Sequence, residues 1–337
     1  MLYGPNVFDS PDEYLDPRNL PPVPLVKLPA RLNRFPPSER VHIYGQLAFQ
    51  WPLRSLKHPA VFQMLSEASR QGLLDGVHTI VDSSSGNTAF CEAVLAKALG
   101  KKVRLFIPGD IPKTKEERLR NLGVAPEKCY DRPHEPSAIQ KAQAAGQEAG
   151  CYYVGQYSSK WNVDGHERFH IQPAWVQTRE GMTVYCCGTG TTGTVNAALQ
   201  FFRKNAPHVR IVAGMCASED PVPGLRTRKR LEEVPLAKSI LNGESGDLAV
   251  VEVRRPQTFQ SSWELAEERI NAGPSSGTAR VALENFLFKT REDPDAWEQL
   301  RNKDGDIVAV FMCGDAFDLY DIEKYTTILD PDVIPIR

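Results

Sequence analysis

The chain has 337 residues, 41% of them hydrophobic, and a formal net charge of −2. This length predicts two packed domains, and the apolar content is enough for a sizeable core. Without a basic excess there is no reason to expect nucleic acid as a partner. No apolar run reaches the roughly 20 residues of a membrane span. The stretch from Met1 to Pro24 carries acids and prolines, and we expect no secretory leader there.

The cysteine pattern indicates a reducing compartment. No C-x-x-C spacing occurs, and several cysteines lie in apolar runs typical of strands. An odd count without a leader favours reduced, buried thiols in a cytoplasmic protein. We expect core packing as the role of each cysteine, although a catalytic role for one of them stays open. The seven are Cys91, Cys129, Cys151, Cys186, Cys187, Cys216 and Cys313.

Strand and helix patterns alternate after a proline-rich arm, which predicts α/β architecture with parallel sheets. The expected strands are 41–44, 79–81, 103–107, 152–154, 183–187, 209–216, 248–253 and 307–311. The expected helices are 88–99, 113–122, 138–149, 195–204, 262–271 and 276–290. A polar stretch at 157–165 separates two alternating blocks and indicates a change of domain there.

The segment Ser84-Ser85-Gly86-Asn87-Thr88 directly follows an apolar run and opens a helix. Its hydroxyls and backbone N–H groups converge at a helix N-terminus, where the dipole favours anions. Helix capping alone would also explain it. Upstream, Lys57 stands at an expected helix start, where desolvation and helix-terminal charge lower the proton affinity of an amine that forms Schiff bases. A solvated surface lysine is the alternative.

Two further loops complete the set. Gly188-Thr189-Gly190-Thr191-Thr192-Gly193 follows a strand and opens a helix, so its backbone N–H groups and hydroxyls can bind a phosphate. The same letters satisfy G-x-G-x-x-G, with Glu219-Asp220 as an acid for a ribose, which keeps a nicotinamide-dependent oxidoreductase as an alternative. Gly273-Pro274-Ser275-Ser276-Gly277 opens another helix, and its serine can meet a heterocyclic nitrogen or cap the helix.

In this order and spacing, the four segments resemble the fold-type II pyridoxal-phosphate enzymes of the cysteine synthase and cystathionine β-synthase family. Trp51-Pro52-Leu53-Arg54-Ser55-Leu56-Lys57 is similar to its N-P-x-x-S-x-K segment, and the three loops are similar to T-S-G-N-T, G-T-G-G-T and S-x-G. Pro24-Leu25-Val26-Lys27-Leu28 and Gln156-Tyr157 also match family segments. The resemblance covers nearly the whole chain and implies a two-domain fold, a homodimer and pyridoxal 5′-phosphate as cofactor.

The resemblance implies a role for each matching residue. Lys57 would carry the cofactor as an internal aldimine and act as the base, and Asn87 would bind the pyridoxal 3′-oxygen. Ser275 would face the pyridine nitrogen without protonating it, which favours β-elimination through an aminoacrylate. The substrate carboxylate would be held by Ser84, Ser85, Thr88 and Gln156. The phosphate would be held by Gly188, Thr189, Gly190, Thr191 and Thr192.

The sequence departs from the family at several positions. Arg54 replaces a glycine, His58-Pro59 replaces Asp-Arg after the lysine, and Thr191 replaces a loop glycine. The segment Pro223–Arg230 replaces the family's G-I-G-x-G pocket loop. We expect Arg226 or Arg228 to bind an anionic group of the substrate, such as a phosphate leaving group or a carboxylated nucleophile, with a solvated basic face as the equal alternative.

These observations predict β-replacement on serine or an activated serine, O-acetyl- or O-phosphoserine, with a small nucleophile that the sequence does not identify. A β-elimination lyase or dehydratase of the same fold is the alternative. We expect residues 46–163 to form a smaller mobile domain and residues 1–45 with 164–337 the larger one. His166-Glu167-Arg168-Phe169-His170 spells H-E-x-x-H, but no third ligand is evident, and we expect no metal.

Overall fold

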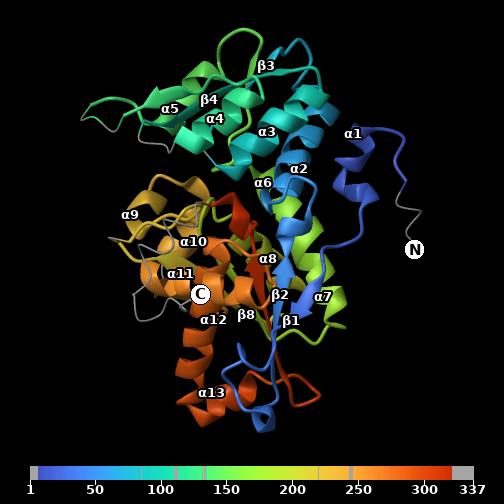
Figure 1. Cartoon of the computed structure of the whole chain (residues 1–337), viewed down its shortest axis with the longest axis vertical. Coiled ribbons are helices and arrows are strands. Elements are labelled where there is room, and N and C mark those ends of the chain that lie inside the picture. Colours follow the sequence, from blue (N-terminus) through green and yellow to red (C-terminus); the bar gives the residue numbers. More distant parts are fainter. Residues whose placement is uncertain are drawn as a thin grey trace. The chain divides into compact units, whose positions relative to one another are not determined.

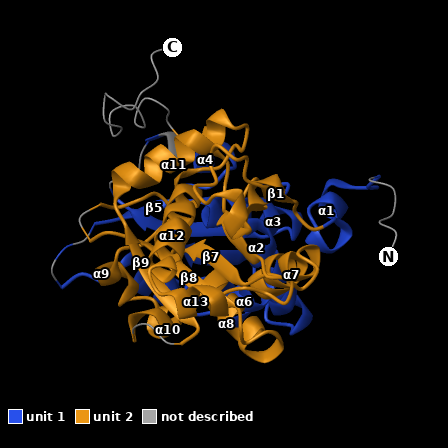
Figure 2. Cartoon of the chain, turned by 90° about the horizontal axis from the view of Figure 1, so that it is seen from below, with its two compact units in different colours: residues 1–21, 51–53, 57–165 blue, residues 22–50, 54–56, 166–337 orange. Residues whose placement is uncertain are grey.

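In a computed structural model of the protein, the described residues are 7–84, 86–109, 113–130, 132, 134–218, 220–242 and 246–320. The chain divides into two units (Figure 2). Unit 1 consists of residues 1–21, 51–53 and 57–165, and unit 2 of residues 22–50, 54–56 and 166–337. The division at 46–163 that the sequence suggests stays a prediction about which part of the chain moves as a domain.

Unit 1 is built on a parallel four-stranded sheet in the order β5-β4-β3-β6, of which Figure 1 labels β3 and β4. Its strands are β3 (Thr79–Ser83), β4 (Lys102–Pro108), β5 (Glu127–Cys129) and β6 (Cys151–Tyr153), and its helices are α2 (Lys57–Arg70), α3 (Asn87–Ala98), α4 (Lys113–Asn121) and α5 (Ala138–Ala145). Successive strand residues face opposite sides. Ile80 therefore packs with apolar residues of α2 and α3, whereas Val81 packs with Ala142 and Ala145 of α5.

The segment with α1 (Pro11–Tyr14) and the 3-10 turn η1 (Pro17–Asn19) packs on α2 within unit 1. His58 Nε2 lies 2.7 Å from Leu15 O, so the ring donates a hydrogen bond to this carbonyl. The Arg18 guanidinium lies 5.2 Å from the centre of the Phe62 ring. Burial lowers the pKa of His58 from 6.5 to about 4, so the ring is neutral at neutral pH.

Unit 2 is built on a six-stranded sheet in the order β1-β2-β10-β7-β8-β9, in which only the β1–β2 pair is antiparallel. Its strands are β1 (Leu25–Lys27), β2 (Val41–Leu47), β7 (Val184–Gly188), β8 (Arg210–Cys216), β9 (Leu248–Val253) and β10 (Ile307–Cys313). The helix α12 (Pro274–Arg291) packs on one face, where Leu283 meets Val184 and Cys186. On the other face, the rings of Tyr185 and Phe202 lie 6.3 Å apart, which places α8 (Gly193–Asn205) there.

Shorter elements connect these layers. The helix α11 (Arg255–Glu267) packs closely on α12, because a Cβ at Gly277 would lie 2.0 Å from Thr258 O. The remaining helices are α6 (Lys160–His166), the π-helical turn η4 (Glu167–Ile171), α7 (Gln172–Gln177), α9 (Arg228–Leu231), α10 (Lys238–Leu241) and α13 (Pro294–Gln299). The remaining 3-10 turns are η2 (Pro37–Glu39), η3 (Ala48–Gln50), η5 (Pro235–Ala237) and η6 (Phe317–Leu319).

The α/β architecture with parallel-rich sheets is confirmed, with differences at element ends. The helix expected at 262–271 begins at Arg255, next to Pro256, and ends at Glu267, because Arg269 takes a left-handed φ of 64°. The helix expected at 138–149 ends at Ala145. No disulfide joins any of the seven cysteines. None of the helices in the described ranges is long and apolar enough to cross a membrane.

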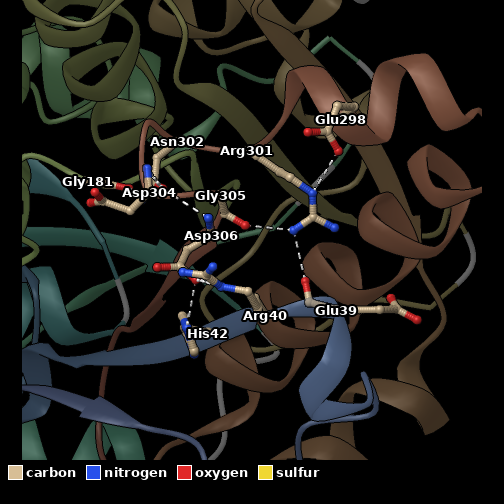
Figure 3. Close-up of polar contacts among 10 residues, drawn as sticks. All are labelled: Glu39, Arg40, His42, Gly181, Glu298, Arg301, Asn302, Asp304, Gly305 and Asp306. Carbon is tan, nitrogen blue, oxygen red and sulfur yellow. Dashed lines mark hydrogen bonds and ion pairs between the residues drawn. The ribbon is translucent and has the colours of Figure 1, made fainter.

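The turn before β10 is fastened to the start of β2 (Figure 3). Asn302 Oδ1 accepts the N–H groups of Asp304 and Asp306, both at 3.0 Å, and Asn302 Nδ2 donates to Gly181 O at 3.0 Å. Arg40 Nε donates to Asp306 Oδ1 at 2.7 Å. This pair lowers the pKa of Asp306 below its usual value. Because β2 and β10 are neighbours, the turn sets where both strands begin.

We predict that Asn302→Ala lowers the free energy of unfolding by about 1–2 kcal/mol, because one side chain satisfies three backbone groups. The matched control is Asp304→Asn, which keeps the backbone N–H that Asn302 accepts and should change stability by less than about 0.5 kcal/mol. Urea denaturation of both variants measures the effect. Equal stability of the two variants would contradict the structural role of the Asn302 side chain.

We predict that the neutral state of His58 makes stability depend on pH. Its pKa in the folded state is about 4, below the 6.5 of an unfolded chain, so only the unfolded state takes up this proton as the pH falls. Between about pH 7.5 and about pH 5, the wild type should therefore lose about 2 kcal/mol that His58→Gln does not lose. All other groups titrate in both proteins and cancel. Parallel stability curves against pH would refute this prediction.

Candidate active site

Lys57 is the first residue of unit 1 after a short segment of unit 2, residues 54–56. It begins α2, as the sequence predicts, and is half-buried. The residue before it is held in unit 2, because Leu56 N donates to Gly314 O at 2.7 Å. Ser55 forms a β-bridge with Asp315. The backbone directly before the lysine is therefore fixed to the end of β10.

The serine predicted to face the pyridine nitrogen lies beside this anchor. A Cβ at Gly314 would lie 2.7 Å from Leu56 Cδ2 and 3.1 Å from Ser275 Oγ, so these two side chains converge on Gly314. A Cβ at Gly188 would lie 3.5 Å from Ser275 O. The neighbouring Ser276 Oγ accepts the Gly314 N–H at 3.2 Å. Within unit 2, the residue before Lys57, Ser275 and the first loop glycine are thus neighbours.

The predicted phosphate loop joins β7 to α8. Thr189 is held by its backbone N and its Oγ1, which both donate to Gly214 O at 2.9 and 3.2 Å. Its carbonyl accepts the Arg226 N–H at 2.8 Å. A Cβ at Gly190 would lie 2.6 Å from Gly224 O, so this position accepts only glycine without a shift of the backbone. The loop therefore presents bare backbone at the N-terminus of a 13-residue helix.

Thr192 closes this loop in a strained conformation. Its φ is 64°, which is rare for a β-branched residue and costs on the order of 1–3 kcal/mol. Asn196 holds it in place, since Asn196 Nδ2 donates to Thr192 O at 2.9 Å and to Leu236 O at 2.7 Å. Ser239 Oγ donates to Asn196 Oδ1 at 3.0 Å. The packing around Asn196 thus compensates for the strain that shapes the loop.

The predicted carboxylate loop lies in unit 1, between β3 and α3. Ser84 Oγ accepts the Ala89 N–H at 3.2 Å and so caps α3, while its hydroxyl hydrogen can still donate to an anion. Thr88 Oγ1 donates to Gln156 Oε1 at 2.8 Å, and Gln156 Nε2 donates to Ser83 O at 2.9 Å. The structure thus brings Thr88 and Gln156 together.

The other predicted site residues are also divided between unit 1 and unit 2. Asn87 is the first residue of α3 in unit 1, and Ser85 lies outside the described residues. In unit 2, Thr191 Oγ1 accepts the Gly193 N–H at 3.3 Å. Arg226 is half-buried and its Nη1 donates to Arg230 O at 3.3 Å, whereas Arg228 is exposed with its Nε 4.0 Å from Glu252.

The acid of the nicotinamide alternative and the H-E-x-x-H motif both make contacts that fit a structural role. Asp220 Oδ2, an acid that the nicotinamide alternative would use for a ribose, accepts the backbone N–H of Arg255 at 3.4 Å. His166 and His170 are fully buried with their Nδ1 atoms 3.3 Å apart, at the end of α6 and in the π-helical turn. The described part of the chain contains no group of three or more His, Cys, Asp or Glu side chains that could hold a metal ion.

Three supporting residues were not predicted. Asn196 steadies the phosphate loop from inside α8, and Asp82 and Glu92 are fully buried on either side of the carboxylate loop. Asn196 follows the glycine–threonine loop by one helical turn, which is a weak signal. An acid inside the apolar run of β3 and another on the Ala- and Leu-rich α3 would have been a stronger signal, because buried carboxyls are rare without a partner.

The residues present fit pyridoxal phosphate. Gly188 and Gly190 leave no room for side chains, so loop backbone and a helix N-terminus can approach a phosphate closely. Ser275 supplies a neutral hydroxyl next to the residue that precedes Lys57. Within unit 2, these groups have the chemistry that a phosphate and a heterocyclic nitrogen require.

Comparison with known proteins agrees with this fit. A probable cysteine synthase of Bacillus subtilis (strain 168) is 30% identical over 262 residues, which cover 75% of this chain and 83% of that protein. The crystal structure of an O-ureido-L-serine synthase matches with a TM-score of 0.74 and 21% identity, covering 93% of both chains. An O-acetylserine-dependent cystathionine β-synthase from Helicobacter pylori matches with a TM-score of 0.74 and 17% identity, covering 93% of this chain and 97% of that one.

A family model described as "Pyridoxal-phosphate dependent enzyme" matches residues 20–299. This match includes Lys57, both predicted anion-binding loops and Ser275. It therefore decides against the nicotinamide-dependent oxidoreductase considered as an alternative. The chain belongs to the family of pyridoxal-phosphate dependent enzymes.

Proposed function

We propose that the protein catalyses β-replacement on an activated serine. The observation that carries the proposal is the grouping of Leu56, Ser275, Gly188 and Gly314 in unit 2, because it sets a neutral hydroxyl beside the anchor of Lys57. When bound, pyridoxal phosphate supplies an electron sink for negative charge at the substrate Cα. A neutral partner for the ring nitrogen limits that sink and favours loss of a β-substituent.

The chain's own residues would do the remaining work. Lys57 Nζ, at the start of α2, would hold the cofactor and then remove the proton from Cα. The loop 84–88 with Gln156 would hold the substrate carboxylate, and Asn87 the ring oxygen. The residues of the loop 188–192 would hold the phosphate by backbone N–H groups and hydroxyls. The relatives named cysteine synthase and cystathionine β-synthase support a sulfur nucleophile, and the O-ureido-L-serine synthase supports a broader set.

We also propose a cellular compartment and an oligomeric state for the protein. We infer a cytoplasmic homodimer that works on small amino acids. Seven cysteines without a disulfide support a reducing compartment. The resemblance to a family of homodimers supports the oligomeric state.

We predict that the holoenzyme converts O-acetylserine and sulfide to cysteine, and that Lys57→Ala loses this activity by at least about 10³-fold. Borohydride reduction followed by peptide mapping should find the cofactor on the peptide that contains Lys57. Lys160→Ala is the matched control, since Lys160 is exposed and forms an ion pair with Asp164 on its own helix. Formation of pyruvate in place of a replacement product, with every nucleophile tried, would favour the elimination alternative.

We also propose that Arg226 binds an anionic group of the donor. Its backbone N–H is bonded to Thr189 O of the phosphate loop, so its position lies directly beside that loop. Arg228 is two residues further on, at the exposed start of α9. Arg226 is the better candidate of the two, because its backbone is bonded directly to the loop and that of Arg228 lies two residues further along the chain.

We predict that Arg226→Ala lowers kcat/KM for O-phosphoserine about tenfold more than for O-acetylserine, because a phosphate accepts charge-assisted hydrogen bonds that an acetyl ester does not. Arg228→Ala should show a smaller difference between the donors. Arg203→Ala, an exposed arginine paired with Asp247, is the control. Equal losses on both donors would remove the proposed role of Arg226.

A further inference from the structure

Two fully buried carboxyl groups lie at the ends of the predicted carboxylate loop in unit 1. Asp82 is in β3, one residue before Ser83, and Glu92 is in α3, one helical turn after Thr88. Both residues are 0% exposed. Neither belongs to the groups to which the proposed mechanism gives a role, and a buried carboxylate without a partner is costly.

The carboxyl groups of Asp82 and Glu92 lie within hydrogen-bonding reach of each other. Asp82 also accepts the Ser83 N–H at 2.7 Å and the Gln156 N–H at 3.3 Å. By contrast, neither oxygen of Glu92 has an N–H or hydroxyl donor in the described part of the chain. Two carboxyl groups in contact can form a hydrogen bond only if one of them carries a proton. Glu92 is therefore the protonated partner, and Asp82 accepts from it.

The electrostatic surroundings of the pair agree with one shared proton. Burial raises the pKa of Asp82 to about 6 and that of Glu92 well above its usual value. Burial, together with the charges of Asp82 and Glu92, raises the pKa of Tyr153 in β6, so its hydroxyl is neutral. Burial and the charge of Glu92 raise the pKa of the neighbouring Cys91 of α3, and the charges of Arg118 from α4 and Lys57 from α2 partly oppose this rise.

Asp82 links the Glu92 carboxyl group to the residues predicted to bind the substrate carboxylate. It holds the backbone N–H of Gln156, whose side-chain amide in turn accepts from Thr88 Oγ1 and donates to Ser83 O. Asn162 Nδ2 donates to Gln156 O at 2.6 Å and closes the network. A movement of the Asp82 carboxylate would therefore displace Gln156 and, through it, the Thr88 hydroxyl.

We propose that Glu92 is a positioning residue for the amino-acid substrate: by donating a hydrogen bond to Asp82, it holds Gln156 and Thr88 where they bind the substrate carboxylate. This inference rests on the proposed function only for the identity of the ligand. Without the donor, Asp82 is a buried carboxylate with fewer hydrogen bonds, and it would move or take up a proton. With both carboxyl groups ionised, the pair would also repel the substrate carboxylate.

The test compares L-serine with L-serinamide, which lacks the carboxylate, as ligands of the holoenzyme, with binding followed by the absorbance of the bound cofactor. Glu92→Met removes the donor at similar volume, and Glu92→Gln keeps a donor that does not ionise. We expect Glu92→Met to weaken L-serine binding about tenfold or more, with L-serinamide changed less than about twofold. Glu92→Gln should restore L-serine binding to within about threefold of the wild type.

A pair of control variants and an independent spectroscopic measurement complete the test. Glu148→Met and Glu148→Gln change an exposed glutamate of the same unit and should alter neither ligand. Infrared spectra near neutral pH should show the carbonyl band of a buried protonated carboxyl in the wild type and lose it in Glu92→Gln. This readout needs neither substrate nor turnover.

Several results would overturn the inference. Wild-type L-serine binding in Glu92→Met, equal weakening of both ligands, failure of Glu92→Gln to restore binding, or absence of the infrared band would each do so. The outcome is separate from the proposed function. If no product forms from any activated serine, but Glu92→Met still discriminates the two ligands, then only the proposed function fails. If product forms and Glu92→Met binds like the wild type, then only this inference fails.

Discussion

The site depends on close packing around Gly314, at the end of β10. The absence of a side chain there lets Leu56 and Ser275 Oγ converge on one point, and the Gly314 carbonyl holds the Leu56 N–H. Because Leu56 is bonded to Lys57, this contact fixes where the lysine leaves unit 2. A methyl group at Gly314 would displace either the lysine anchor or the hydroxyl predicted to face the ring nitrogen. The proposed function requires Lys57 to lie near the cofactor, and backbone contacts rather than a flexible side chain would set that position.

The loop 188–192, proposed to bind the phosphate, shows how local backbone strain is offset by hydrogen bonds. Thr191 replaces a loop glycine of the family, and the next residue, Thr192, takes a left-handed φ of 64°. Threonine in this conformation costs free energy that glycine would not. The bonds from Asn196 to Thr192 and Leu236 offset that cost and fix the loop before any ligand binds. Preorganised backbone donors lose little entropy when they meet a phosphate.

Sequence patterns sufficed for eight of the strands and for the motifs, because both depend on local periodicity and on residue types with specific chemistry. The three-residue strands β1 and β5 are too short to show such a periodicity and were not predicted. The start of α2 at Lys57 and the loop from β7 to α8 are examples. The helix from Arg255 could not be placed in the same way, because its end depends on a left-handed arginine that no local pattern encodes. The contacts of Asp82 with Glu92 and Gln156 join residues from three segments, and only the folded chain brings these together.

Arg54 shows how a departure from the family can be accommodated. It takes a φ of 57° where the resemblance expects glycine, and the strain of a non-glycine residue there must be offset by its contacts. Its Nη2 lies 2.5 Å from Asp318 Oδ1, which also accepts from Asn271 Nδ2 at 3.1 Å. Hydrogen bonding to Arg54 lowers the pKa of Asp318, so this carboxylate stays ionised at neutral pH. The substitution thus adds an ionic contact between the segment before Lys57 and the residues that follow β10. The same anchor that Gly314 sets through its backbone is strengthened here by a side chain that a glycine could not provide.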